Sequence, residues 1–386
     1  MKRKSILLMM PTLTQGGFER ICILTARMLQ EHYDVSILVF TRKGQFYDVS
    51  DLSVMDIDIP AKPGKMRKLF NVLKRVKVLK KIRKQNKYDY VYSFGTSANL
   101  VNVLSRKYGK TIIGVRGYEA IDNKIEMWIN TKLADKVVCC SKVIEEGIRN
   151  NYSTKELVTL YNPCDVERIC KLKDEINELK YEELFDGSKK IIMSMGREDD
   201  EKGFWHLLKA FSLVSQKVED ARLLIMGAGD FNEYVELAKK LKIHNKTFFL
   251  EAQENPFQYL KRATLYLLTS RSEGFPNALI EAMAVGVPVM SVNCKSGPAE
   301  ILSDNYLEVL DDTKTYYSQY GIILPMVEME RNMDADVIDK EEIVIAEEMI
   351  KMLCDDAKLI GYGKKSSERA RDFSNDRYIQ GFIDML

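Results

Sequence analysis

Short apolar runs alternate along the first part of the chain with segments of helical periodicity. The runs predicted to form buried strands are residues 5–10, 35–40, 88–93, 111–115 and 136–140. After the first run, residues 19–30 place Ile21, Leu24 and Met28 on one side of a helix. Strands that alternate with helices require crossover connections, so the pattern predicts a parallel sheet covered by helices.

The same pattern starts again near Lys190. A strand at 191–195 is followed by a charged turn at 196–203 and a helix at 204–218. Further strands are predicted at 222–226, 247–250 and 263–269, and a further helix from about Pro276. The sequence therefore predicts an α/β protein of two doubly wound, Rossmann-like domains that face each other across a cleft. The predicted segments are domains at 1–170 and 190–370, a linker region at 171–189, and a C-terminal helix at 371–386.

Composition narrows the class of protein. Of 386 residues, 46% are hydrophobic and 30% charged, which excludes a disordered or fibrous chain. No apolar run approaches the roughly 18 residues of a membrane-spanning helix. The seven cysteines form no C-x-x-C pair and accompany only three histidines, so neither a zinc site nor a disulfide framework is expected. We expect a protein of the cytoplasm without a metal or other cofactor.

Charge is distributed unevenly. Residues 1–170 contain 30 Lys and Arg against 17 Asp and Glu, a net charge of +13, whereas 171–386 contain 28 against 39, or −11. Residues 62–87 alone carry 12 Lys and Arg and no acid. Apolar residues recur there at helical spacing, namely Leu69, Val72, Leu73, Val76, Leu79 and Ile82.

Two interpretations of the basic helix at 62–87 stay open, and they are compatible. The apolar stripe packs on the domain's own sheet, or the helix docks on an anionic membrane surface, where each basic residue contributes about 1 kcal/mol. Nucleic acid would also satisfy the charge, but no recognisable binding module accompanies the helix. We therefore expect a membrane surface and no nucleic acid as its partner.

The segment 270–281 carries the strongest local signal. Pro276 suits the first position of a helix, whose free N–H groups and partial positive charge attract a phosphate. Glu273 lies in the loop before that helix and Glu281 one turn into it. Glu281 can then reach a ribose hydroxyl and Glu273 a group beyond the phosphate. The alternative is that both are solvated surface acids.

The turn at 196–203 is the second signal. Arg197 and Lys202 stand beside a helix N-terminus, where the helix dipole disfavours cations unless an anion binds. An Arg fork and a Lys point charge together suit a diphosphate, although neighbouring acids at 199–201 could neutralise them. In the first domain, Gly16 and Gly17 either permit a tight turn or let the backbone approach a ligand. No P-loop or G-x-G-x-x-G motif follows a strand.

The chain resembles the retaining GT-B glycosyltransferases of family four over nearly its full length. The resemblance rests on Gly16-Gly-Phe-Glu-Arg20, Leu160-Tyr-Asn-Pro-Cys-Asp165, Gly196-Arg with Lys202-Gly, Glu273-Gly-Phe-Pro-Asn with Glu281-Ala, and Ser296-Gly-Pro-Ala-Glu-Ile301. It implies a nucleotide-sugar donor, with UDP-sugar indicated by the variant Gly274, Phe275, Pro276 and Asn277. A hexose or N-acetylhexosamine would be transferred to a polyprenyl-diphosphate-linked saccharide in surface polysaccharide synthesis.

The resemblance also implies roles for individual residues. Arg197 and Lys202 would hold the diphosphate, Glu281 the ribose and Glu273 the donor sugar, while Gly17 would close on the phosphate. Retention is described in this family as front-face attack, in which the leaving phosphate helps to deprotonate the acceptor hydroxyl. No metal is required. The enzyme would act on the inner face of the cell membrane as a peripheral protein.

The sequence departs from the family pattern at two places. Many relatives carry a histidine in the first domain, and here Arg116, in the stretch 116–119 after a strand, is expected in that region as a substrate-binding residue. Ala252 stands where the base-recognition loop of relatives often has glycine. Two alternatives stay open. One is a UDP-sugar epimerase of the same fold, and the other is a catalytically silent subunit of a membrane synthesis complex, for which the missing histidine is the sequence hint.

Overall fold

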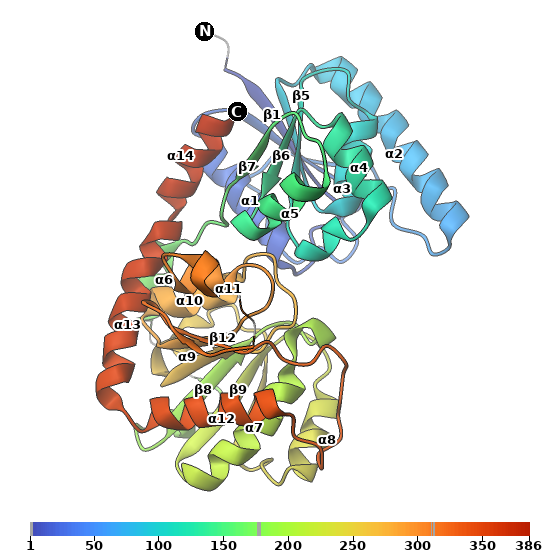
Figure 1. The fold of residues 1–386 in the computed structure, drawn as a ribbon. Helices are drawn as coiled ribbons and strands as arrows, with labels where there is room; N and C mark the ends of the chain where they lie inside the picture. Colours follow the sequence, from blue (N-terminus) through green and yellow to red (C-terminus); the bar gives the residue numbers. More distant parts are fainter. Residues whose placement is uncertain (1–2, 176–178, 310, 312) are drawn as a thin grey trace. The chain divides into compact units, whose positions relative to one another are not determined.

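The computed structural model describes residues 3–175, 179–309, 311 and 313–386 (Figure 1). The chain divides into two compact units. The first unit consists of the N-terminal part of the chain up to Pro163 together with the C-terminal segment Asn375–Leu386. The second unit is Cys164–Ser374. Of the stretch 171–189 expected as a linker, 176–178 lie outside the described residues and the remainder belongs to the second unit. Among the described residues, no helix is both long and apolar enough to cross a membrane.

The first unit is built on a parallel sheet in the order β3-β2-β1-β4-β5-β6-β7. Its strands are β1 (Ser5–Met10), β2 (Asp34–Val39), β3 (Val54–Asp56), β4 (Tyr90–Phe94), β5 (Lys110–Val115), β6 (Lys136–Cys139) and β7 (Leu157–Thr159). Its helices are α1 (Gly17–Leu29), α2 (Lys65–Asn86), α3 (Thr96–Leu104), η1 (Tyr118–Ile121), α4 (Lys124–Leu133), α5 (Lys142–Asn151) and α14 (Asn375–Met385).

Alternate residues of β1 enter different cores of the first unit. Ile6, Leu8 and Met10 pack with α1 and with Tyr378 and Phe382 of α14. Leu7 and Met9 pack on the other face, with residues of α2 and α3. This period of two is that of a strand covered on both faces, which explains why residues 6–10 of β1 are all apolar.

The second unit has a sheet in the order β10-β9-β8-β11-β12-β14-β13, parallel except for the antiparallel edge pair β13–β14. Its strands are β8 (Lys190–Met195), β9 (Ala221–Gly227), β10 (Thr247–Glu251), β11 (Leu265–Leu268), β12 (Val289–Val292), β13 (Tyr316–Tyr317) and β14 (Ile322–Leu324). Its helices are α6 (Val166–Leu172), η2 (Glu182–Phe185), η3 (Asp200–Lys202), α7 (Phe204–Lys217), α8 (Asn232–Lys240), α9 (Phe257–Arg262), α10 (Asn277–Val285), α11 (Pro298–Leu302), η4 (Tyr306–Val309), α12 (Lys340–Leu353), α13 (Asp356–Ala370) and η5 (Arg371–Phe373).

Helices cover both faces of the second sheet. The core around α7 includes the fully buried Trp205 and Phe211 and residues of α8 and α12. On the other side α10 contacts α6, α9 and α13. The doubly wound fold fixes the turns after β8, β11 and β12 at one edge of the sheet, where ligands bind in open α/β proteins.

Candidate functional site

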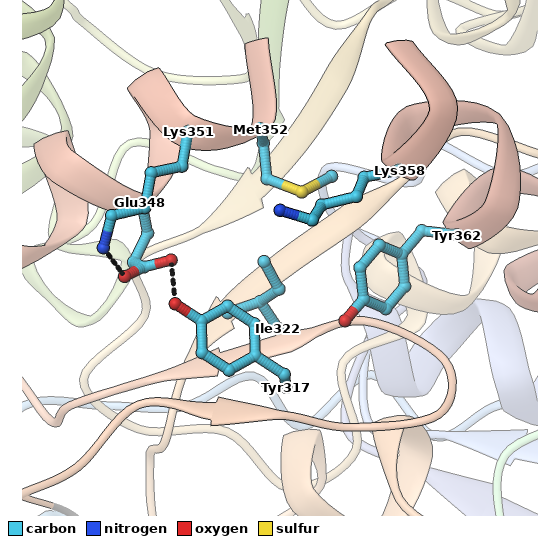
Figure 2. A pocket seen from close by; sticks show the side chains of 7 residues that line it. All are labelled: Tyr317, Ile322, Glu348, Lys351, Met352, Lys358 and Tyr362. Carbon is cyan, nitrogen blue, oxygen red and sulfur yellow. Dashed lines mark hydrogen bonds and ion pairs between the residues drawn. The ribbon is translucent and has the colours of Figure 1, made fainter. Parts of the chain in front are cut away.

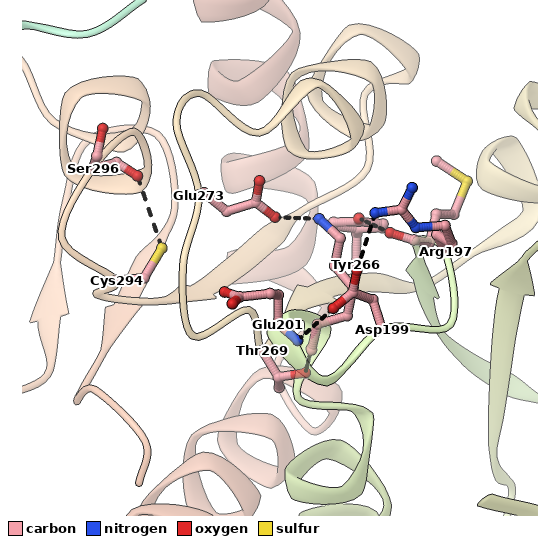
Figure 3. A network of polar contacts seen from close by, with 10 residues as sticks. Arg197, Asp199, Glu201, Tyr266, Thr269, Glu273, Cys294 and Ser296 are labelled. Carbon is pink, nitrogen blue, oxygen red and sulfur yellow. Dashed lines mark hydrogen bonds and ion pairs between the residues drawn. The ribbon is translucent and has the colours of Figure 1, made fainter. Parts of the chain in front are cut away.

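The predicted site residues of the second unit lie in turns that follow β8 and β11. These two strands are neighbours in the sheet and run parallel, with Leu265 opposite Ile192. β12 is the next strand, parallel to β11. The turns at 196–203, 269–276 and 293–297 therefore lie at one edge of the sheet, and Figure 3 shows polar contacts around Arg197, Asp199 and Glu273 in the first two turns.

The first turn is shaped by its backbone, and an exposed ion pair lies within it. Gly203 has φ +60°, and a Cβ there would lie 2.4 Å from the carbonyl oxygen of Thr269, so only glycine fits. Arg197 Nη2 donates to Asp199 Oδ2 at 3.0 Å, and the Glu201 N–H donates to Asp199 Oδ1 at 3.0 Å. The Arg197 side chain is 64% exposed and accessible to a ligand.

Lys202 links the first turn to the second. Its Nζ lies 2.5 Å from Glu273 Oε1 (Figure 3). Burial opposes the charged form of Lys202, but the carboxylate of Glu273 outweighs it, and the pKa of Lys202 is raised above its ordinary value. Both side chains are largely shielded, with 25% and 12% exposed. The predicted diphosphate residue and the predicted sugar residue are thus in direct contact.

Backbone contacts reinforce the same junction. Thr269 Oγ1 donates to the carbonyl oxygen of Lys202 at 3.1 Å, and the Arg271 N–H donates to the carbonyl oxygen of Glu201 at 2.7 Å. Arg271 Nε also donates to the carbonyl oxygen of Asp200 at 3.0 Å. These bonds hold the two turns together, which pre-organises Lys202 relative to Glu273.

The second turn leads into α10. Pro276 has an extended ψ of 101° and occupies the N-cap, so the helix begins at Asn277, one residue later than the position expected for Pro276. Gly274 and Phe275 are buried, and the Phe275 ring packs edge-on against Phe373 at 5.3 Å between centroids. Packing of the Phe275 side chain in the interior therefore supports the loop. Its role in substrate binding stays a prediction.

Glu281 lies on α10 and is 8% exposed. The helix ends at Gly286, which has φ +95°. A buried carboxylate on a helix whose N-terminus belongs to the second turn fits the predicted ribose contact. Its contact with the ribose stays a prediction.

The third turn supports the second. Ser296 Oγ donates to the carbonyl oxygen of Gly274 at 2.7 Å. A Cβ on Gly297, which has φ +96°, would lie 2.4 Å from Pro276 Cδ. Burial raises the pKa of the Cys294 thiol, so this cysteine stays protonated beside the site (Figure 3). The Ser296–Gly297 motif therefore holds the Glu273 loop in place.

In the first unit, the turn between β1 and α1 is shaped by a carboxylate that sequence reasoning gave no role. A Cβ on Gly16 would lie 2.1 Å from Glu19 Oε2, so a larger residue there would displace this carboxylate from its present position. Glu19 Oε1 accepts from Thr12 Oγ1 at 3.2 Å, and Tyr47 Oη donates to the carbonyl oxygen of Gly16 at 3.0 Å. Gly17 is exposed at the start of α1. The sequence feature that could have pointed to Glu19 was its position within the motif Gly16–Arg20.

Arg116 follows β5 in the first unit and is engaged by protein groups. Nη1 donates to Asn162 Oδ1 and Nη2 to Tyr92 Oη, each at 2.7 Å. The guanidinium also stacks over the Phe94 ring, 4.8 Å from its centroid. In this arrangement Arg116 joins β4, β5 and the segment after β7. Its predicted contact with substrate stays a prediction.

A group of buried ionisable residues lies behind the first turn. His206 Nδ1 is 2.7 Å from Glu342 Oε1, and these two residues and Asp339 place donor atoms within 4.8 Å of one another, as a metal site would. However, Lys209 Nζ lies 3.8 Å from the same Glu342 oxygen. Because the lysine already supplies a cation, we assign this cluster to packing of α7 against α12.

A separate hollow of about 390 Å³ lies in the second unit between β14 and helices α12 and α13 (Figure 2). Tyr317 Oη donates to Glu348 Oε2 at 2.8 Å and Lys351 Nζ donates to Oε1 at 2.7 Å. None of the predicted site residues lines it. The hollow is distinct from the junction of Lys202 and Glu273.

Comparison with known families shows to which family the chain belongs. Residues 175–317 match the family described as glycosyl transferases group 1, and residues 15–168 match glycosyltransferase family 4. The chain is a group 1 glycosyltransferase of family 4. It is 30% identical over 338 residues to an uncharacterized glycosyltransferase of Methanocaldococcus jannaschii, covering 81% of this chain and 82% of that protein. The predicted family is confirmed.

Another relative has a defined activity. The glycosyltransferase is 26% identical over 339 residues to the N-acetylgalactosamine-N,N'-diacetylbacillosaminyl-diphospho-undecaprenol 4-alpha-N-acetylgalactosaminyltransferase of Campylobacter jejuni, covering 82% of this chain and 88% of that protein.

Solved structures confirm the GT-B fold. HepE of Anabaena, solved in complex with UDP and glucose, has a TM-score of 0.73 at 17% identity and covers 99% of this chain and 98% of that one. The sucrose-phosphate synthase of Thermosynechococcus elongatus has a TM-score of 0.77 at 14% identity, with 99% and 98% covered. At these identities the likeness concerns the fold alone.

Proposed function

We propose that this glycosyltransferase takes its sugar, a hexose or N-acetylhexosamine, from a UDP-sugar. The observation that carries the proposal is the contact between Lys202 and Glu273, which brings the predicted diphosphate and sugar residues together. Arg197 adds a second, exposed cation beside Lys202. HepE, which shares the fold, was solved with UDP, and this supports uridine as the base.

The proposed acceptor is a saccharide on a polyprenyl diphosphate. It is supported by the Campylobacter jejuni relative, whose name specifies a diphospho-undecaprenol acceptor. We place the reaction in surface polysaccharide synthesis, at the inner face of the cell membrane.

The proposed reaction retains the configuration of the anomeric carbon. The acceptor hydroxyl oxygen forms a bond to the anomeric carbon while the bond between the anomeric carbon and the diphosphate oxygen breaks. The hydroxyl proton passes to the departing phosphate. Arg197 and Lys202 would stabilise the negative charge that develops on the diphosphate, and Glu273 would orient the sugar. Catalysis would then rest on positioning and electrostatics, without a metal ion.

The test is turnover by the purified protein. UDP-sugars are screened with a polyprenyl-diphosphate saccharide, with EDTA present and absent, and the anomeric configuration of the product is determined by NMR. Retained configuration and a rate unaffected by EDTA support the proposal. Product formation from UDP-sugar without any acceptor would favour the epimerase, and no turnover with any donor would favour the silent subunit.

We also propose that α2 docks the first unit on an anionic membrane. The predicted apolar stripe divides in the structure: Val76 and Leu79 are buried in the unit's core, whereas Leu69 and Leu73 are 55% and 54% exposed. Met66 and Phe70 are also exposed, at 66% and 64%, so residues at i, i+3, i+4 and i+7 form an apolar ridge toward solvent.

Basic side chains continue that side of the helix. Lys74, Lys77 and Lys81 are exposed, and Lys74 and Lys77 follow Phe70 and Leu73 at a spacing of four residues. In Figure 1 α2 lies on the outside of its unit. An apolar ridge flanked by lysines is typical of a helix that lies in the interface of an anionic bilayer. Sedimentation with liposomes that contain or lack anionic lipid tests this. Equal binding to both liposomes would contradict an electrostatic contribution.

A further inference from the structure

Asp199 binds to the first turn in the way that a ligand anion would. One carboxylate oxygen accepts from the Arg197 guanidinium and the other from the backbone N–H of Glu201, each at 3.0 Å (Figure 3). The positive charge of Lys202 also acts on this carboxylate. A guanidinium, a backbone N–H and a nearby ammonium are the donors with which proteins hold a phosphate oxygen.

Neighbouring acids of the turn are placed differently. Asp200 Oδ1 lies 3.3 Å from Arg331 Nε, on the far segment before α12. Glu273 pairs with Lys202 and is itself a proposed substrate residue. Asp199 thus has its carboxylate on the exposed cation that is proposed to hold the diphosphate.

The Arg197–Asp199 pair can open readily. The two side chains are 64% and 31% exposed, and exposed ion pairs contribute little stability because water and salt screen them. Opening leaves the turn intact, because Gly203 and the contacts of Thr269 and Arg271 with the backbone do not depend on the pair. A diphosphate can therefore replace the carboxylate without refolding the loop.

We propose that Asp199 is an internal competitor of the nucleoside diphosphate for Arg197. The inference rests on the proposed function and adds a regulatory element to the same site. When the donor binds, a phosphate oxygen replaces Asp199 Oδ2 on the guanidinium. After transfer, Asp199 takes Arg197 back and so hastens release of the nucleoside diphosphate product. The cost is a weaker affinity for donor and product alike.

The test compares Asp199→Asn with Asp200→Asn and wild type. Asparagine keeps an oxygen that can accept from the Glu201 N–H, so the local turn is preserved, and Asp200→Asn removes the same charge one residue away. UDP affinity is measured by calorimetry and UDP dissociation by stopped flow. We expect Asp199→Asn to bind UDP about threefold or more tightly and to release it correspondingly more slowly, with a smaller change in Asp200→Asn.

Three other results would overturn the inference. Equal tightening in both variants would show a general effect of charge, and weaker binding in Asp199→Asn would show that Asp199 supports the site. Unchanged binding would show no competition. In each of these cases UDP still binds and the proposed function stands, whereas no UDP binding by any of the three proteins would contradict the proposed function as well.

Discussion

Lys202 Nζ and Glu273 Oε1 lie 2.5 Å apart, although 71 residues separate them in the chain. One residue ends the turn after β8 and the other belongs to the turn after β11. The parallel pairing of these strands brings the turns together, and the ion pair fixes their distance. The pair therefore connects the group proposed to stabilise the leaving diphosphate with the group proposed to orient the sugar.

Glu273→Gln is expected to reduce turnover more than nucleotide affinity. Loss of a charge-assisted bond to the sugar costs about 1.5–3 kcal/mol, or roughly ten- to a hundredfold in rate. UDP lacks the donor sugar that Glu273 is proposed to contact, so its affinity is expected to stay within about threefold of wild type. Steady-state kinetics and calorimetry check this. Glu219→Gln, an exposed acid before β9, is the control, and equal losses of turnover in both variants would contradict the assignment.

Glu281→Gln is expected to weaken binding of ligands that contain a ribose and to leave binding of the phosphates alone unchanged. Affinity for UDP should fall about tenfold, because a ribose hydroxyl loses a charged acceptor. Affinity for inorganic pyrophosphate, which has no ribose, should be unchanged. Competition binding with both ligands measures this difference, and a parallel loss for pyrophosphate would show that Glu281 acts on the turn as a whole.

Gly203→Ala is expected to lower the free energy of unfolding by about 2 kcal/mol or more. The left-handed conformation costs a non-glycine residue roughly 1–2 kcal/mol, and the new Cβ would meet the Thr269 carbonyl oxygen. Gly361→Ala, in the exposed part of α13 with no atom within 4 Å of its Cβ, should raise stability by about 0.5–1 kcal/mol. Urea unfolding of both variants checks the contrast. A neutral Gly203→Ala would contradict the geometry of the turn.

Phe70→Asp is expected to weaken binding to liposomes with and without anionic lipid, because it places a charge on the ridge. Lys74→Glu with Lys77→Glu should weaken binding to anionic liposomes by about 1 kcal/mol or more for each lysine, and leave neutral liposomes unaffected. Ile360→Asp is the matched control, since Ile360 is 75% exposed on α13 of the other unit. Docking through α2 would be contradicted if Phe70→Asp and Ile360→Asp sedimented alike.

Long buried strands were predictable from the sequence and short ones were not. β1 occupies the predicted residues 5–10 because a central parallel strand is apolar throughout. β3, β7 and β14 have three residues each, too few to show a period. The apolar run 282–294 contains the end of α10 and all of β12, separated at Gly286. Periodicity alone does not distinguish a buried helix from a buried strand.

The site was predictable as a set of turns, but the partners of its side chains were not. Adjacency of β8 and β11 follows from the doubly wound fold, which places Lys202 near Glu273. The choice of Asp199 rather than Asp200 as the partner of Arg197 depends on side-chain geometry. Arg116 was expected to face substrate, whereas its contacts with Asn162 and Tyr92 depend on segments distant in sequence.

The measurement that tests the central claim most directly is calorimetric binding of UDP, GDP and ADP to wild type, Arg197→Ala and Arg222→Ala. Arg222 lies on β9 and donates to the carbonyl oxygens of Glu219 and Ala221, away from the predicted turn. The account predicts that wild type and Arg222→Ala bind UDP alike. It predicts that Arg197→Ala binds UDP roughly ten- to a hundredfold more weakly. Binding of no nucleotide, or equal binding of UDP by Arg197→Ala and wild type, would contradict it.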